Sequence, residues 1–208
     1  MKWKQWSAVV VLAGTALAVQ AQSVNPATLA NTGGDGLAAC ASCHGAQGEG
    51  QGAMPRLAGI NAAYLRKQLD DLAEGRREHA LMSPIAKAMS PQTREAMSGY
   101  YAGMALPAAA PPGDAHPGAR VAQRGAWDRN VPGCVQCHGP GGRGVGDAFP
   151  PIAGQTADYL STQLEAWKAG RRNNDPIGLM QAAARGLTAE EIRDVSDYFS
   201  RLPMEASR

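Results

Sequence analysis

The four cysteines of this 208-residue chain fall into two matching patterns. Residues 40–44 read CASCH and residues 134–138 read CVQCH, so each pattern has two thiols separated by two residues and a histidine directly after the second thiol. This is the pattern of covalent haem attachment. Two thiols at this spacing can bond to the two vinyl groups of one porphyrin, while the adjacent histidine reaches the iron. The sequence therefore predicts two covalently bound haem c groups, held by Cys40, Cys43, His44, Cys134, Cys137 and His138.

Other uses of cysteine fit this spacing less well. An exported chain with an even number of cysteines could form disulfides, but disulfides would not require the two histidines. A zinc site needs its cysteine pairs within about 15 to 20 residues of each other, whereas these pairs are 94 residues apart. A thioredoxin-like redox site needs alternating strands and helices, and no stretch alternates in the manner of a strand. Disulfides remain the main alternative to haem.

Methionines are the candidates for the second axial ligand of each iron, because histidine and methionine form a common ligand pair in electron carriers of raised potential. After the second cysteine pattern the chain has only Met180 and Met204, and Met204 follows the last expected helix. When the two halves are aligned, Met180 falls on Met82, so we predict these two as the axial pair. Core packing is the alternative role for any one methionine. His79, close to Met82, has no histidine counterpart in the second half, and it is expected at the surface, as is His116.

The haem attachment pattern occurs twice because the chain contains an internal repeat. At an offset of 94 residues CASCHGAQGEGQG aligns with CVQCHGPGGRGVG, and at 95 MPRLAG aligns with FPPIAG and YLRKQL with YLSTQL. The similarity continues through the GRR triplets at 75–77 and 170–172. A repeat of this length predicts two similarly folded halves, and two copies are too few for a solenoid.

Helices are expected in both halves. Apolar residues recur at helical spacing before Gly75 and Gly170, which should end those helices, and the last helix of each half should begin after Ser90 or Thr188. The predicted fold is all-α, with two tandem domains that each wrap around one haem. The predicted segments are a signal peptide at 1–21, an N-terminal domain at 22–104, a linker rich in proline, alanine and glycine at 105–118, and a C-terminal domain at 119–208.

Composition and the N-terminal segment limit the functions that are possible. The first 21 residues have a basic start, a short apolar run and small residues before a cut after Ala21, which is the layout of a secretory signal peptide. We therefore expect a periplasmic protein. Without Lys2 and Lys4 the 20 basic residues become 18, equal to the 18 acidic residues, so nothing indicates a nucleic-acid partner. Only 5% of residues are aromatic, so a bulky cofactor would help to fill two small cores.

Taken together, these motifs resemble the cytochrome c4 group, periplasmic proteins built from two class I cytochrome c domains. The resemblance runs from about Gly36 to Leu202 and includes both cysteine patterns, PRLAG and FPPIAG, YLRKQL and YLSTQL, and the GRR triplets. It implies that the carbonyls of Pro55 and Pro150 accept a hydrogen bond from the second ring nitrogen of the two histidines. It also implies that four further side chains lie near the haem propionates or the interdomain face, namely Tyr64, Arg76, Tyr159 and Arg171. The glycines of NTGGDG before Cys40 predict a short first helix.

The resemblance implies an electron carrier rather than an enzyme. Both axial positions of each iron would be filled, so no substrate would bind the metal. Its redox partners would be an upstream dehydrogenase or quinol:cytochrome c reductase and a downstream terminal oxidase, and peripheral association with the membrane stays open. One alternative is the electron-accepting cytochrome subunit of a periplasmic dehydrogenase, for example one that oxidises thiosulfate or an alcohol. A dihaem peroxidase is a further alternative, but it needs two unequal sites, which the close repeat disfavours.

Overall fold

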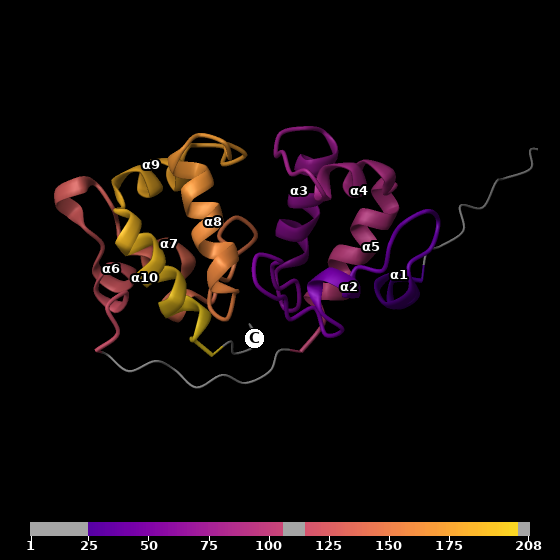
Figure 1. The fold of residues 1–208 in the computed structure, drawn as a ribbon, viewed down its shortest axis with the longest axis horizontal. Coiled ribbons are helices and arrows are strands. Elements are labelled where there is room, and N and C mark those ends of the chain that lie inside the picture. Colours follow the sequence, from indigo (N-terminus) through magenta and orange to yellow (C-terminus); the bar gives the residue numbers. More distant parts are fainter. Residues whose placement is uncertain (1–24, 106–114, 204–208) are drawn as a thin grey trace, which may run out of the picture.

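In a computed structural model of the protein, the residues whose structure is described are 25–105 and 115–203. Two helical domains lie side by side, and helices α3 and α8 face each other across the boundary between them (Figure 1). The predicted signal peptide and residues 106–114 of the predicted linker lie outside the described residues. The repeat in the sequence thus corresponds to two domains in space.

The N-terminal domain is built from five α-helices within residues 25–105. They are α1 (Pro26–Thr32), α2 (Ala41–His44), α3 (Ala62–Ala73), α4 (Met82–Ala88) and α5 (Pro91–Ala102). Helix α5 packs against α1 and α3, and α4 packs against α3. Helix α1 has seven residues and ends at Gly33, as the glycine run predicts, because glycines weaken a helix.

The C-terminal domain repeats this arrangement within residues 115–203. Its helices are α6 (Ala119–Arg124), η1 (Trp127–Arg129), α7 (Cys134–His138), η2 (Pro140–Gly142), α8 (Ala157–Lys168), α9 (Leu179–Gly186) and α10 (Ala189–Ser200). Helix α10 packs against α6 and α8, and α9 packs against α8. In both described segments extended pairing is limited to isolated bridges, so the predicted all-α fold is confirmed. None of the described helices has the length and apolar character needed to cross a bilayer.

Helix boundaries follow the capping residues read from the sequence. The Ser90 hydroxyl accepts a hydrogen bond from the backbone N–H of Thr93 at the start of α5, and Thr188 forms a capping box with Glu191 at the start of α10. Gly75 and Gly170 follow the ends of α3 and α8 with φ of 79° and 72°. This left-handed conformation is easy for glycine and costly for other residues.

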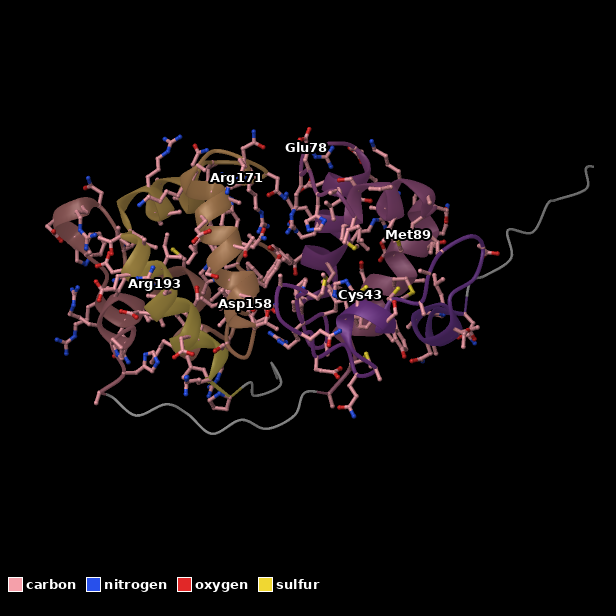
Figure 2. The ribbon with its side chains drawn as sticks, in the orientation of Figure 1. Cys43, Glu78, Met89, Asp158, Arg171 and Arg193 are labelled. Carbon is pink, nitrogen blue, oxygen red and sulfur yellow. The ribbon has the colours of Figure 1, made fainter. Side chains whose placement is uncertain are left out.

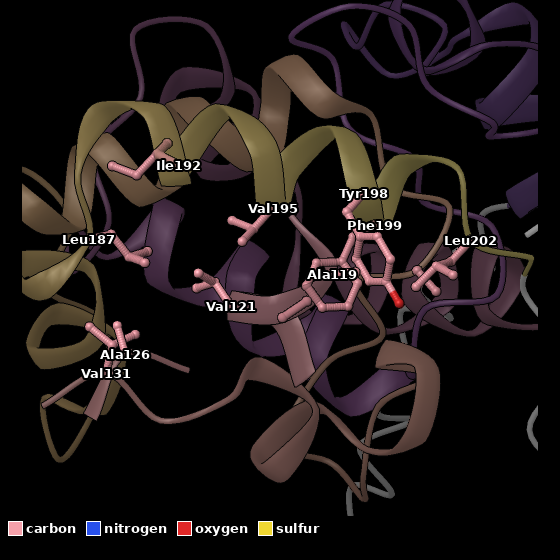
Figure 3. Packing of buried hydrophobic residues seen from close by; sticks show 12 residues of the cluster. Ala119, Val121, Ala126, Val131, Leu187, Ile192, Val195, Tyr198, Phe199 and Leu202 are labelled. Atoms are coloured by element: carbon pink, nitrogen blue, oxygen red, sulfur yellow. The ribbon is translucent and has the colours of Figure 1, made fainter. Parts of the chain in front are cut away.

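Each domain has its own hydrophobic core. In the C-terminal domain Ile192, Val195 and Phe199 lie along one face of α10 and point toward Val121 of α6 (Figure 3). The two helices approach closely at Gly118, where an added Cβ would collide with the carbonyl of Asp194. The corresponding cluster of the N-terminal domain is smaller and consists of Leu29, Ala30, Ile60, Leu65, Met89, Met97 and Tyr101.

An ion pair beside the α10 cap should contribute to the stability of the C-terminal domain. The carboxylate of Glu191 accepts hydrogen bonds from Arg129 at 2.6 and 2.8 Å and from the backbone N–H of Thr188 at 2.9 Å. Arg129 is the main cause that lowers the pKa of this carboxyl from 4.5 to about 2. Glu191→Ala should lower the free energy of unfolding by about 1 kcal/mol at neutral pH, because a helix cap and a partly screened ion pair are lost.

The pH dependence of this effect has a definite sign. Because the pKa of Glu191 is lowered in the folded protein, its contribution is complete above the ordinary value of 4.5 and disappears as the pH falls toward 2. Thermal unfolding of Glu191→Ala and the parent protein should therefore differ at neutral pH and converge on acidification. Glu190→Ala, an exposed neighbour in the same turn, is the control and should show a smaller difference. A gap that is the same at pH 7 and at about pH 3 would contradict the assignment.

Candidate functional site

Each cysteine pair lies on one short helix of its domain. Cys40 and Cys43 belong to α2 and its N-cap, and Cys134 and Cys137 lie on α7. All four are free thiols, so the described structure does not contain the disulfides that stood as the alternative. Burial raises the pKa of Cys134 to about 11 and raises that of Cys40. In each domain the two thiols are therefore presented from the same helix, one turn apart.

The two histidines that follow the cysteines have the same environment. His44 and His138 are each only 6% exposed, and Nδ1 of each ring lies 2.8 Å from a carbonyl oxygen, that of Pro55 or of Pro150. A carbonyl only accepts, so each Nδ1 carries the proton and each Nε2 keeps a free lone pair. Burial lowers the pKa of both rings, against the opposite effect of the carbonyl bond. Both rings are thus held neutral, as metal-binding imidazoles must be.

Glycine-rich loops bring the proline carbonyls to the histidines. Both haem-motif helices end at a glycine with positive φ, Gly45 at 83° and Gly139 at 76°. The chain then folds back, so that the carbonyl of each histidine accepts a hydrogen bond from a backbone N–H six residues later, at 2.7 Å in both domains. The repeat thus preserves the loop geometry as well as the sequence pattern.

Met82 and Met180 occupy similar places in the two domains. Met82 is the first residue of α4 and Met180 is the second residue of α9, and both are partly buried. The backbone N–H of Met82 donates to Nδ1 of His79 at 3.2 Å. The backbone N–H of Met180 donates to the carboxylate of Asp175. His79 is exposed, as expected, but it also helps to shape the start of α4.

Other methionines of the N-terminal domain are already used in packing. Met89 is 7% exposed and Met97 is 3% exposed, and both belong to the hydrophobic core. Figure 2 shows Met89 among the helices of this domain rather than at its surface. Core packing, the alternative role considered for any methionine, therefore applies to these two. Of the partly buried methionines Met54, Met82 and Met104, the repeat alignment with Met180 favours Met82.

The chain around the two motifs fits a large flat group that is apolar in its body and charged at its edge. Apolar side chains next to each core remain only partly buried, among them Leu57, Leu69, Ile85, Ile152, Leu160 and Leu164. The indole Nε1 of Trp167 is buried without a hydrogen-bond partner, although a buried donor normally has one. The apolar body of a porphyrin would cover the aliphatic side chains, and a propionate carboxylate would suit the indole N–H.

The interface between the domains includes a reciprocal set of polar contacts. Nη2 of Arg77 donates to the Tyr159 hydroxyl at 3.2 Å and to Gln163 Oε1 at 3.0 Å. The equivalent Arg172 donates to the Tyr64 hydroxyl at 3.2 Å and to Gln68 Oε1 at 3.0 Å. Each residue of the first set has its repeat equivalent in the second, at an offset of 95. The two domains therefore meet around an approximate twofold axis.

The arginines that donate across the interface are Arg77 and Arg172, whereas the resemblance implied that Arg76 and Arg171 lie near the propionates or the interdomain face. Arg76 instead pairs with Asp71 and Glu74 of its own domain, and Arg171 is exposed beyond the end of α8 (Figure 2). In each GRR triplet it is the backbone N–H of the second arginine that donates back to the preceding helix, at 3.0 Å for Arg77 and 3.1 Å for Arg172. Spacing alone could not distinguish two adjacent arginines, because the turn decides which of them faces the interface.

Comparison with known proteins identifies the family. The cytochrome c family model matches residues 32–106 and 115–203. The thiosulfate dehydrogenase electron acceptor of Stutzerimonas stutzeri (strain A1501) is 46% identical over 202 residues, which cover 92% of this chain and 94% of that protein. Cytochrome c4 of Thiocapsa roseopersicina is 38% identical over 168 residues, covering 78% of this chain and 86% of that protein.

Solved structures show the same relationship. Reduced recombinant cytochrome c4 from Pseudomonas stutzeri superposes with a TM-score of 0.73 at 30% identity, over 78% of this chain and 93% of that chain. The as-isolated thiosulfate dehydrogenase from Marichromatium purpuratum superposes with a TM-score of 0.80 at 43% identity, over 86% of this chain but only 40% of that longer chain. Two matches to the family model, two attachment patterns and these structural neighbours together imply two covalent haem c groups. The chain therefore belongs to the cytochrome c family, as a two-domain member of the cytochrome c4 type.

Proposed function

We propose that this dihaem electron carrier holds each haem with the residues that its repeat places on equivalent helices. The thioether bonds would come from Cys40 and Cys43 in one domain and from Cys134 and Cys137 in the other. The axial ligands would be His44 with Met82, and His138 with Met180. The observation that supports the histidine assignment is the 2.8 Å contact from each Nδ1 to a proline carbonyl, which directs the free Nε2 away from the backbone.

When bound, each haem supplies an iron that alternates between the ferrous and ferric states. The protein would hold both axial ligands of each iron in place, so that electron transfer is not accompanied by substrate binding at the metal. The neutral histidine rings are fixed in one tautomer by Pro55 and Pro150. A methionine on the opposite side would occupy the remaining axial position, so that no substrate reaches the metal.

The haem propionates would lie toward the domain interface and the last turn of α8. Arg172 is 5% exposed and stacks over the ring of Trp167, with its guanidinium carbon 3.9 Å from the ring centroid. Across the interface Arg77 and Arg172 donate to hydroxyl and amide oxygens, namely those of Tyr64, Tyr159, Gln68 and Gln163. Carboxylates in this region would gain charge-assisted hydrogen bonds and compensate buried positive charge.

The partner we favour at the donor side is a periplasmic thiosulfate dehydrogenase, with a terminal oxidase downstream. Two relatives with 46% and 41% identity are named thiosulfate dehydrogenase electron acceptors, whereas the relatives named cytochrome c4 are 30% to 38% identical. The higher identity extends over 92% and 82% of this chain, so it includes the surface as well as the haem motifs. Export through the predicted signal peptide would bring the protein to the periplasm.

A reduction assay tests this choice of donor. The ferric dihaem protein, mixed with a catalytic amount of thiosulfate dehydrogenase and thiosulfate, should show growth of the reduced haem band. The matched reaction replaces the dehydrogenase with a quinol:cytochrome c reductase and a quinol, and it should be slower by about tenfold or more if complementary surfaces direct the encounter. Equal rates would favour a general respiratory carrier, and reduction only by the quinol system would contradict the proposal.

A further inference from the structure

A single arginine joins the two domains at a point where the repeat is broken. Arg56 follows Pro55 in the N-terminal domain, and its repeat equivalent in the C-terminal domain is Pro151. Arg56 is 2% exposed although it carries a charge, and its hydrogen-bond partners are backbone carbonyls and a glutamine rather than acidic side chains. Burying a charge without a counter-ion costs free energy unless its N–H donors form hydrogen bonds. Packing alone therefore does not explain why an arginine occupies this position.

The guanidinium of Arg56 is satisfied by backbone carbonyls of both domains. Nε donates to Gly154 O at 3.1 Å and Nη2 to Ala153 O at 3.1 Å, both in the C-terminal domain. Nη1 donates to the carbonyl of Ala58 in its own domain. Ala58 and Ala153 are repeat equivalents, so one side chain binds the same carbonyl in both copies of the repeat.

A glutamine of the C-terminal domain completes this contact. Gln155 is 3% exposed, its Oε1 accepts from the backbone N–H of Arg56 at 2.8 Å, and its Nε2 donates to the carbonyl of Arg56 at 3.1 Å. The first half has Ile60 at the equivalent position, which cannot make either bond. Pro151 has no N–H and no charge, so the mirror-image contact cannot form.

The peptide unit between Pro55 and Arg56 therefore connects the N-terminal haem site to the other domain. Its C=O accepts the hydrogen bond from Nδ1 of His44, and its N–H donates to Gln155 of the C-terminal domain. The peptide between Pro150 and Pro151 accepts a hydrogen bond from Nδ1 of His138 through its C=O in the same way. It has no N–H to donate, because its nitrogen belongs to a proline. Only the N-terminal histidine is held by a peptide that is itself bound across the interface.

We propose that Arg56 and Gln155 are positioning residues that make the two haem sites unequal, because an interdomain hydrogen bond acts on the peptide that holds His44 and has no counterpart at His138. A fixed cation close to an iron disfavours the ferric form, which carries one more positive charge than the ferrous form. Burial lowers the pKa of Arg56 to about 10, which still leaves the guanidinium charged at neutral pH. The guanidinium binds the equivalent carbonyls of Ala58 and Ala153, so its charge should raise the reduction potentials of both haems. The difference between the two sites should come from the hydrogen bond between Gln155 and the peptide that holds His44. This inference rests on the proposed role of His44 as an iron ligand.

The test uses the intact dihaem protein and follows each haem separately in a redox titration by NMR, with hyperfine-shifted signals assigned through the two cysteine pairs. Arg56→Met should lower the potentials of both haems by similar amounts, because the guanidinium lies between the equivalent carbonyls of Ala58 and Ala153. Arg193→Met removes the same charge from an exposed site on α10 (Figure 2) and is the control. Solvent and salt screen an exposed charge, so this control should shift neither potential. No shift at either haem in Arg56→Met, or equal shifts at both haems in Gln155→Leu, would overturn the proposal.

A second variant keeps the test informative if Arg56→Met does not mature. Gln155→Leu leaves the charge of Arg56 in place and removes the two bonds to its backbone. Although this substitution lies in the C-terminal domain, it should move the potential of the N-terminal haem more than that of its own domain. A larger shift at the C-terminal haem would show that the residue acts locally and would overturn the proposal. The haem content and low-spin spectrum of each variant report separately on the iron ligands.

Discussion

Replacing Cys134 and Cys137 together with alanine should halve the covalent haem content of the protein. The two thioether bonds of one domain would be lost, and the small core around α10 would have no attached porphyrin to complete it. The intact mass should fall by one haem relative to the parent protein, beyond the change in the side chains themselves. Far-ultraviolet circular dichroism should show a loss of helix that corresponds to about one domain.

The equivalent double variant of Cys40 and Cys43 is the matched control for this experiment. It should also retain one haem, now in the C-terminal domain, which shows that the two sites are loaded independently. The parent protein should have two haems and an N-terminus at Gln22, as the predicted signal peptide requires. If pigment is extracted from the parent protein by acid and acetone, or if the double variant keeps two covalent haems, the attachment assignment is wrong.

Met82→Ala and Met180→Ala should each open one iron to carbon monoxide. The parent protein should not bind carbon monoxide under native conditions, because a histidine and a methionine fill both axial positions. Each single variant should show about half the carbon monoxide difference spectrum of the double variant, with both haems still covalently attached. The reason is that the methionine contributes an axial bond but no covalent link to the porphyrin.

Met97→Leu is the control for the methionine substitutions. Met97 is 3% exposed in the core of the N-terminal domain, and leucine conserves most of its volume. This variant should be slightly less stable and should bind no carbon monoxide. Carbon monoxide binding by Met97→Leu, or its absence in Met82→Ala, would assign the N-terminal ligand to a different methionine.

Local features of the sequence were sufficient to predict the fold. The capping residues Ser90 and Thr188 and the glycines after α3 and α8 act within a few residues of where they occur, so helix ends could be read directly. The repeat then extended each local inference to a second copy. The attachment pattern was equally accessible, because the chemistry of two thiols and a histidine depends on a spacing that one short helix satisfies.

The interdomain contacts were beyond such reasoning, because they join residues that are about a hundred positions apart. Arg77 and Arg172 were missed in favour of their neighbours, since a turn rather than a spacing directs them across the interface. His116 was expected at the surface, but its Nε2 lies 2.9 Å from the carboxylate of Asp197 and its side chain is 14% exposed. Arg56 could have been noticed as a departure from the repeat, but its role depends on carbonyls that only the folded chain brings together.

The single arginine at the domain boundary also explains what a covalent tandem can do that two separate copies cannot. A symmetric homodimer of one such domain presents the same surface twice, so it would place either two arginines or none at its axis. Two buried guanidiniums at that point would repel each other, and with none the carbonyls of Ala58 and Ala153 would lose a shared donor. Joining the copies in one polypeptide allows each to diverge, so that an asymmetric junction can form between two nearly equivalent domains.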